Sequence, residues 1–321
     1  MTFMLLWLVL GLALLVAGGE LLVRGAVATA RHLKISPLVI GVTLVGFGTS
    51  TPELVTSLEA AFRGSPGIAV GNVVGSNTAN ILLILGLSAL IYPIACDPRA
   101  LTRDATVAVI AALACLAVVV NGTIGTTTGF VFLAALAGYV AFSLVQDRRK
   151  AGPAAALHQQ EADLVARVGT GLWLSIGLAV AGIAITILGA RVLVDAAIEL
   201  TQTFGISETI IGLTIVAVGT SLPELVSSVI AAFRRHGAVA LGNVLGSHIY
   251  KVFGILGVTA AVHPLDIPTQ ILRLDIWVML AATAAMMLFA VTGRRLSRGE
   301  GAALFCGYIV YTGFLAATAA G

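Results

Sequence analysis

The sequence predicts an all-α polytopic membrane protein made of two inverted halves, and three observations lead to this fold class. The chain of 321 residues is 59% hydrophobic and only 10% charged, whereas a soluble domain normally carries about 25% charged residues. Its apolar residues gather in ten runs that are each long enough to span a bilayer. Two long segments are near-copies of each other at a constant separation of 171 residues.

The ten apolar runs are predicted to be transmembrane helices. They are rich in Ala, Leu and Gly, and they are longer than the alternating segments of about 10 residues that build a membrane barrel. The first run lacks the basic residues of a secretory signal, and it aligns with residues 174–194, so it belongs to the duplicated fold. The predicted spans are 3–23, 37–62, 67–93, 104–121, 126–146, 169–192, 208–233, 237–263, 273–292 and 301–320.

Five helices in each half is an odd number, so the second half enters the membrane upside down, as in many secondary transporters. We predict a first repeat at 1–146, a cytoplasmic linker at 147–168 and a second repeat at 169–321. With the N-terminus outside, most Lys and Arg residues fall on the cytoplasmic side. The basic residues therefore indicate which loops face the cytoplasm. We expect a monomer in the inner (plasma) membrane, with lipid and small cations as partners and no nucleic acid.

The first chemical motif is a proline break beside an acid. GTSTPE at 48–53 is repeated as GTSLPE at 219–224. Proline removes one helical hydrogen bond, and lipid tolerates such a break only where protein, water or an ion satisfies the freed groups. The predicted helices 2 and 7 are therefore broken. In each copy Ser and Glu are three residues apart and share a face, which gives the pairs Ser50/Glu53 and Ser221/Glu224.

The second motif is GNVVGSNTAN at 71–80, repeated as GNVLGSHIYK at 242–251. Its glycines, four residues apart, favour close packing of this helix against the broken one. That packing would aim Ser76 and Asn80 at the same centre. No Gly-Lys-Ser/Thr follows, so the motif is not a phosphate-binding loop.

Acids inside a membrane are functional by default, and Glu53 and Glu224 occur in the same frame on inverted helices. Hard cations prefer carboxylate, carbonyl and hydroxyl oxygens. We therefore predict a cation site at Glu53 and Glu224 and transport by alternating access. An ion channel could use the same oxygens, but inverted broken helices suit alternating access better. With no HExxH and no usable GxSxG, we expect neither an enzyme nor a cofactor, the transported ions being Ca2+, Na+ or H+.

The paired motifs resemble the two alpha-repeats of the cation/calcium antiporter superfamily, which includes the sodium/calcium exchangers. The resemblance covers the whole chain and implies exchange of Ca2+ against Na+, H+ or K+, with helices 1 and 6 as the sliding pair. It implies the prokaryotic form, without large regulatory domains. The ion ligands that it implies are Thr49, Ser50, Glu53, Ser76 and Asn80 in the first half, and Ala217 (by its carbonyl), Thr220, Ser221, Glu224 and Ser247 in the second.

One position departs from this pattern, because Lys251 stands where the family usually has Asp or Asn, and His248 replaces the usual Asn. Three roles for Lys251 remain open. It fills one ion position as a tethered cation, it exchanges protons and couples cation movement to H+, or it snorkels or pairs with one acid. The first two roles predict a monovalent-cation or cation/H+ exchanger. The third predicts a weakened exchanger or a non-transporting sensor. His248 could assist proton coupling or be a packed helix residue.

Overall fold

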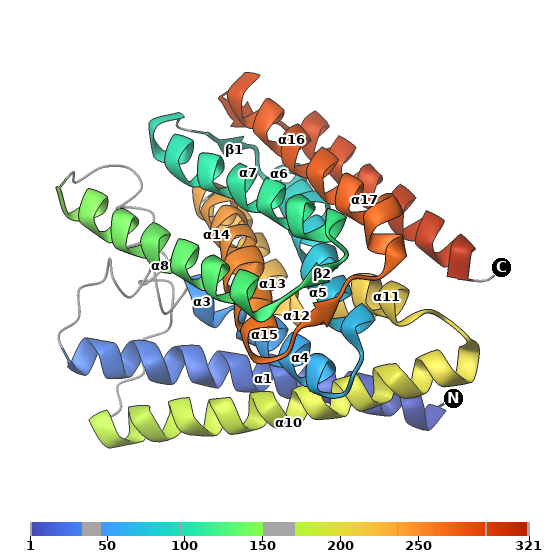
Figure 1. Ribbon diagram of the computed structural model, residues 1–321. Coiled ribbons are helices and arrows are strands. Elements are labelled where there is room, and N and C mark those ends of the chain that lie inside the picture. The colour runs from blue at the N-terminus through green and yellow to red at the C-terminus, as the bar shows by residue number, and fades with distance from the viewer. Residues whose placement is uncertain are drawn as a thin grey trace.

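The computed structural model describes residues 2–33, 46–96, 98–149, 171–235, 237–292 and 294–319. These residues are almost entirely helical, and the helices form a layered bundle with α1 and α10 side by side along one edge (Figure 1). Most of the predicted linker at 147–168, and the first part of the predicted span 37–62, lie outside the described residues.

The described part of the first half contains long helices and shorter helical segments. Its elements are α1 (Thr2–His32), α3 (Gly46–Gly48), α4 (Thr51–Phe62), α5 (Pro66–Ala79), η2 (Asn80–Leu85), α6 (Gly86–Ile91), β1 (Ile94–Ala95), α7 (Pro98–Val120), β2 (Thr123–Ile124) and α8 (Thr126–Arg149).

The second half repeats this order. Its elements are α10 (Leu172–Phe204), α11 (Glu208–Ile211), η3 (Gly212–Val216), α12 (Ala217–Thr220), α13 (Leu222–Phe233), α14 (Gly237–Ile249), η4 (Tyr250–Leu256), α15 (Gly257–Val262), β3 (Leu265–Asp266), η5 (Ile271–Asp275), α16 (Ile276–Thr292), β4 (Arg295–Leu296) and α17 (Arg298–Ala319).

Within the described ranges, eight helices are long and apolar enough to span a bilayer. The pair Glu208–Thr220 and Leu222–Phe233, bent by 49°, would add a ninth span. Its repeat partner is the predicted span 37–62, of which only the part from Gly46 onward is described. The chain is thus a multi-pass membrane protein, and the tenth span remains a prediction.

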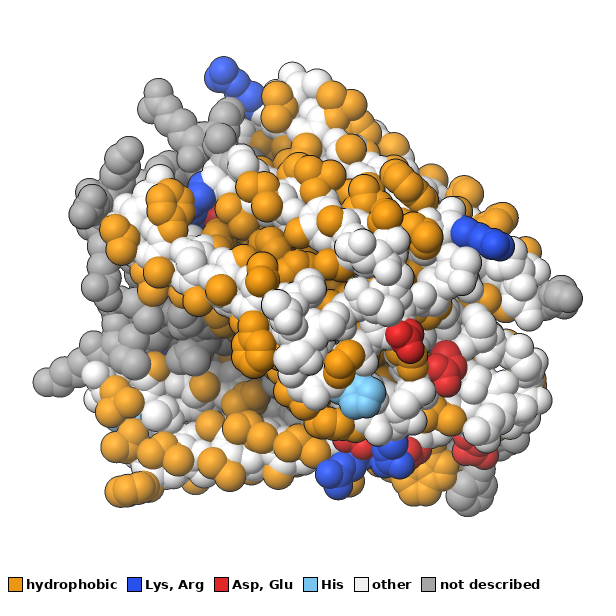
Figure 2. Space-filling view, in the orientation of Figure 1, with side chains coloured by type: hydrophobic (Ala, Val, Ile, Leu, Met, Phe, Trp, Pro, Cys, Tyr) orange, Lys and Arg blue, Asp and Glu red, His pale blue; other side chains and the backbone are white. Residues whose placement is uncertain are grey.

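Two spans form the centre of the bundle. Pro66–Ile91 and Val239–Val262 are 78% and 83% buried in their most apolar windows, whereas the other unbroken spans are 22–33% buried. These two helices carry the second sequence motif. The outer helices expose large apolar side chains, which are spread over much of the face seen in Figure 2. The second motif therefore lies at the protein's interior, away from lipid.

Short strands connect the two halves. β1 pairs with β4, and β2 pairs with β3, each as an antiparallel pair of two-residue strands. In both sheets a strand from the first half meets one from the second half. The hydrogen bonds therefore join the repeats to each other and leave neither half as a separate unit.

The long helices α1 and α10 pack through glycine at very close range. A Cβ atom added at Gly18 would lie 2.9 Å from the carbonyl oxygen of Gly182, and one at Gly189 would lie 2.7 Å from the backbone nitrogen of Leu15. Small residues allow helix backbones to approach in this way within a membrane. The two helices lie side by side, with α3 and α4 next to them (Figure 1).

Candidate functional site

The repeat-related helices α4 and α13 begin in the same way. Ser50 and Ser221 lie just before α4 and α13, with φ/ψ of −90°/11° and −84°/9°, and each helix has a proline in its first two positions. Proline is tolerated there because the first N–H groups of a helix have no intrahelical partner. Glu53 and Glu224 then fall in the first helical turn, where the helix dipole stabilises a negative charge.

The two glutamates face each other across the halves of the protein. Ser50 Oγ donates a hydrogen bond of 2.9 Å to Glu224 Oε1, and Ser221 Oγ donates one of 3.0 Å to Glu53 Oε1. All four side chains are buried. The second oxygen, Oε2, of each glutamate has no hydrogen-bond partner in the described structure. Each repeat therefore supplies the hydroxyl that orients the other repeat's carboxylate.

Lys251 lies between these carboxylates. Its Nζ is 2.8 Å from Glu53 Oε1 and 3.8 Å from Glu224 Oε1, and it donates to Ser221 Oγ at 3.2 Å. When the Asn80 amide is oriented to satisfy both its polar atoms, its oxygen accepts from Nζ at 3.1 Å and its nitrogen donates to the Ser76 carbonyl at 3.2 Å. The repeat-related positions 80 and 251 thus contact each other directly.

The remaining residues expected in the site lie on the same broken helices or on the central helices α5 and α14. Ala217 is less available than the sequence suggests, since its carbonyl already accepts from the Ser221 backbone N–H at 3.2 Å. Thr49 Oγ1 and Ser247 Oγ have no described partner, and neither does either ring nitrogen of the fully buried His248. Ser76 Oγ donates to the Val73 carbonyl at 3.3 Å, within its own helix.

Sequence reasoning missed Asn72, which holds the first helix break in place. Its Nδ2 donates to the Glu53 carbonyl at 3.1 Å and to Ser57 Oγ at 2.9 Å. Its Oδ1 accepts from Thr220 Oγ1 at 3.0 Å. Asn72 therefore connects both broken helices. Its repetition as Asn243, whose Nδ2 bonds Ser228 at 3.2 Å, was the available signal within the second motif.

A second acidic pair, Asp104 and Asp275, is related by the repeat, and each of these acids makes its own contact outside the central cluster. Tyr139 donates to Asp104 at 3.0 Å, and Tyr311 donates to Asp275 at 2.9 Å. Arg103 also binds Asp104 through both of its carboxylate oxygens, at 2.7 and 3.2 Å. At the matching position beside Asp275 stands Leu274, and Asp275 Oδ2 has no described hydrogen-bond partner. The duplication has kept the Asp–Tyr contact but not the counter-charge.

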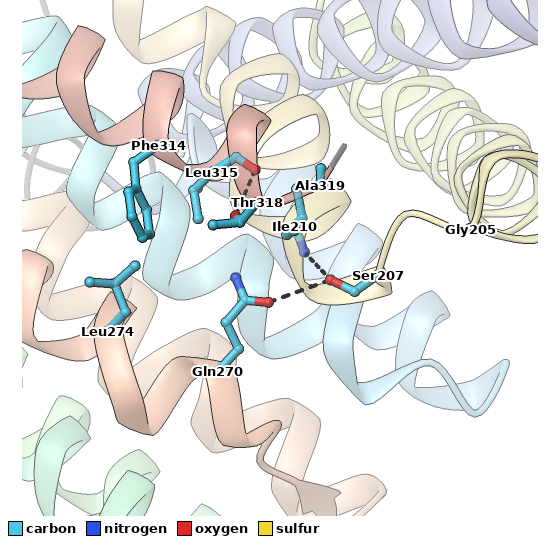
Figure 3. A pocket seen from close by; sticks show the side chains of 9 residues that line it. All are labelled: Gly205, Ser207, Ile210, Gln270, Leu274, Phe314, Leu315, Thr318 and Ala319. Atoms are coloured by element: carbon cyan, nitrogen blue, oxygen red, sulfur yellow. Dashed lines mark hydrogen bonds between the residues drawn. The ribbon is translucent and has the colours of Figure 1, made fainter. Parts of the chain in front are cut away.

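A cavity of about 390 Å³ lies on the Asp275 side, where the neighbouring Leu274 is one of its lining residues. Figure 3 shows it among α11, η5 and the end of α17, with Gln270 and Ser207 turned toward each other. Leu274, the neighbour of Asp275, lines one wall. The cavity is mostly apolar, and its polar groups are few, so the central cluster is the better candidate for a cation site.

The absence of a counter-charge beside Asp275 leads to a prediction about protein stability. Tyr311→Phe should destabilise the protein by about 1–3 kcal/mol, because it removes the donor to a buried carboxyl without an arginine. Tyr139→Phe should cost only about 0.5–1.5 kcal/mol, since Arg103 still binds Asp104. Thermal unfolding of the two variants in detergent measures the difference. Equal losses would contradict the assignment of Asp275 as the less compensated acid.

Comparisons with known proteins give a consistent result. The model for the family "sodium/calcium exchanger protein" matches residues 3–145 and 174–317. Sodium/calcium exchanger MaX1 of Methanosarcina acetivorans is 33% identical over 335 residues, covering 95% of this chain and 96% of that protein. Inner membrane protein YrbG of Escherichia coli is 34% identical over 317 residues, covering 96% and 95%. A structure of the sodium-calcium exchanger NCX_Mj has a TM-score of 0.66 and 32% identity, covering 97% of this chain and 98% of that one.

Proposed function

The chain belongs to the sodium/calcium exchanger family, and we propose that it is a secondary active antiporter whose cation site lies between Glu53 and Glu224. One observation carries this proposal. Two buried carboxylates, one from each half, lie within 4 Å of the Lys251 ammonium, and each keeps an oxygen without a partner among the described residues. A buried carboxylate without full compensation is costly unless it is protonated or binds a cation. The proposed site therefore binds cations at the centre of the bundle.

The proposed ligand set extends around the two acids. It consists of side-chain oxygens and one carbonyl, and the glutamates are the residues that bind a metal ion. The full set is Thr49, Ser50, Glu53, Ser76, Asn80, Ala217 (carbonyl), Thr220, Ser221, Glu224 and Ser247. The serine bonds to the opposite carboxylates support this set, since they hold both acids in one orientation.

The packing supports the proposal of alternating access. A bound cation offsets the charge of the acids, so the occupied site can cross an occluded state that the empty, charged site crosses poorly. The glycine-lined pair α1 and α10 packs beside the broken helices and is the proposed sliding element. We propose ten spans with broken helices 2 and 7, an N-terminus outside, and a monomer in the plasma membrane.

The proposal also concerns which ions are transported. The names of the relatives put Ca2+ and Na+ first, with H+ as an alternative coupling ion. Lys251 favours the other reading, a monovalent-cation or cation/H+ exchanger, because its ammonium group lies inside the proposed site. A non-transporting sensor is the competing function, and only a flux measurement separates it from a transporter.

Proteoliposomes provide that measurement. Purified protein is reconstituted, gradients of Na+, K+ or H+ are imposed one at a time, and uptake of a second cation is followed with and without Ca2+. An antiporter moves the second cation against its own gradient and only when the first gradient is present. Flux that needs no counter-cation, or single-channel currents, would indicate a channel. No flux of any cation would refute the proposal.

A further inference from the structure

We propose that Lys251 is a built-in cation that permanently fills one position of the site, so that the transported substrate is a single monovalent cation such as Na+. This inference rests on the proposed function, and it names the substrate class of the same site. It follows from how the ammonium group is bound, from its burial, and from the charge that it leaves.

The ammonium group is bound as a free ion would be. Four oxygens surround Nζ: Glu53 Oε1 at 2.8 Å, the Asn80 amide oxygen at 3.1 Å, Ser221 Oγ at 3.2 Å and Glu224 Oε1 at 3.8 Å. They come from both broken helices and from the central helix of the first half. An oxygen shell drawn from several elements is what a transported cation requires. The Lys251 ammonium group occupies that shell.

Burial excludes the snorkelling role. Lysine snorkels by carrying its amine out to water, but the Lys251 side chain is fully buried, and it is among the largest fully buried side chains of the described residues. Pairing with one acid alone is also excluded as a full account, because Nζ lies within 4 Å of both glutamates. The amine is therefore part of the site.

The net charge of the site determines which class of cation it can bind. With both carboxylates ionised and the amine protonated, the site carries one net negative charge, and Oε2 of each glutamate remains available as a ligand. A monovalent cation neutralises this charge. A Ca2+ ion would leave the buried site positive, and the ammonium would repel it twice as strongly as it repels Na+, since Coulomb energy scales with the product of the charges.

Lysine at position 251 also supplies no oxygen ligand to the site. Its repeat partner is Asn80, whose amide oxygen is a potential ligand. At position 251 the corresponding group donates hydrogen bonds instead of accepting them. The second half of the site has therefore lost a ligand as well as gained a charge. Both changes act against Ca2+, which takes six to eight oxygen ligands, more than Na+ needs.

Variants at position 251 distinguish the effect of the side-chain charge from the effect of its volume. Lys251→Asn removes the charge and restores the oxygen present in the first repeat, and Lys251→Met removes the charge at similar length. Both should bind Ca2+ at least about 100-fold more tightly than the wild type, Asn more than Met. The matched control is Arg63→Met, which removes an exposed cation that pairs with Glu59 at 3.0 Å. It should leave Ca2+ affinity unchanged.

Two readouts keep the test independent of overall activity. Calorimetry and ion-dependent thermal stabilisation in detergent report Ca2+ and Na+ binding, and proteoliposome flux reports which ion moves. Support requires Na+ flux without Ca2+ flux in the wild type, and a gain of Ca2+ binding in Lys251→Asn. Wild-type Ca2+ transport with the same affinity as Lys251→Asn overturns the inference and leaves the antiport proposal standing. Absence of cation flux in both proteins refutes the proposed function itself.

Discussion

Glu53→Gln and Glu224→Gln are each expected to lower cation flux in proteoliposomes to the level of protein-free vesicles, at least about 100-fold below the wild type. Either change leaves one carboxylate and the Lys251 ammonium, so the buried site has no net negative charge to hold a cation. The amide also supplies a weaker ligand than the unpartnered Oε2 that it replaces. Both variants should fail although their side chains are nearly isosteric with glutamate.

The matched control is Glu20→Gln. Glu20 lies on α1, is exposed and pairs with Arg24 one turn away, so neutralising it should leave flux at the wild-type level. The double variant Glu53→Gln/Lys251→Met restores a net charge of −1 and should recover part of the cation binding that Glu53→Gln loses. Wild-type flux in either single variant would contradict the site assignment.

The two single variants should differ in stability. Nζ of Lys251 is 2.8 Å from Glu53 but 3.8 Å from Glu224. Removing the closer carboxylate leaves a buried ammonium poorly compensated, which typically costs about 3–5 kcal/mol. Glu53→Gln should therefore unfold at a lower temperature than Glu224→Gln, although both lose flux. A lower unfolding temperature for Glu224→Gln would mean that Lys251 depends mainly on the other acid.

The duplicated motifs predicted much of this arrangement. A constant separation of 171 residues pairs Glu53 with Glu224 and Asn80 with Lys251, and the structure brings all four side chains together. The family resemblance, based on those motifs, is confirmed by the comparisons. Duplication makes such pairs visible because residues related by an inverted repeat lie around one axis, and a central site collects them.

Contacts between the halves could not be predicted from spacing within one helix. Ser50 and Glu53 share a helical face, which suggests that they serve one ion together. In the structure Ser50 instead bonds Glu224, and Ser221 bonds Glu53. Only the packing of one broken helix against the other decides this exchange of partners. The direction of the Lys251 side chain is hidden from the sequence for the same reason.

The second acidic pair shows a different limit. Asp104 and Asp275 are 171 residues apart, but Tyr139 and Tyr311 are 172 apart, because the second half is one residue longer before its last helix. A gapless comparison of the halves therefore aligns the aspartates and misses their tyrosine partners. The hydrogen bonds at 3.0 and 2.9 Å reveal that the contact itself is conserved between the repeats.

The second large effect is expected at the contact between α1 and α10, the proposed sliding pair. Gly182→Ala should lower flux about tenfold or more, since overpacking a close contact typically costs about 1–3 kcal/mol. The added Cβ would lie only 2.7 Å from Leu22 Cα and 2.8 Å from the Gly18 carbonyl oxygen. The backbones must separate to admit it, and a contact that has to slide tolerates such a methyl group poorly. Flux under an imposed Na+ gradient measures the loss.

Gly177→Ala is the matched control on the same helix. Gly177 is exposed, and no described atom would lie within 4 Å of its added Cβ, so flux should remain near the wild-type level. Cation binding, followed by thermal stabilisation in detergent, should persist in both variants because neither glycine belongs to the site. A Gly182→Ala protein that binds cations and also transports them at the wild-type rate would exclude α1 and α10 as the sliding pair. One that no longer binds cations would show that the contact shapes the site rather than its movement.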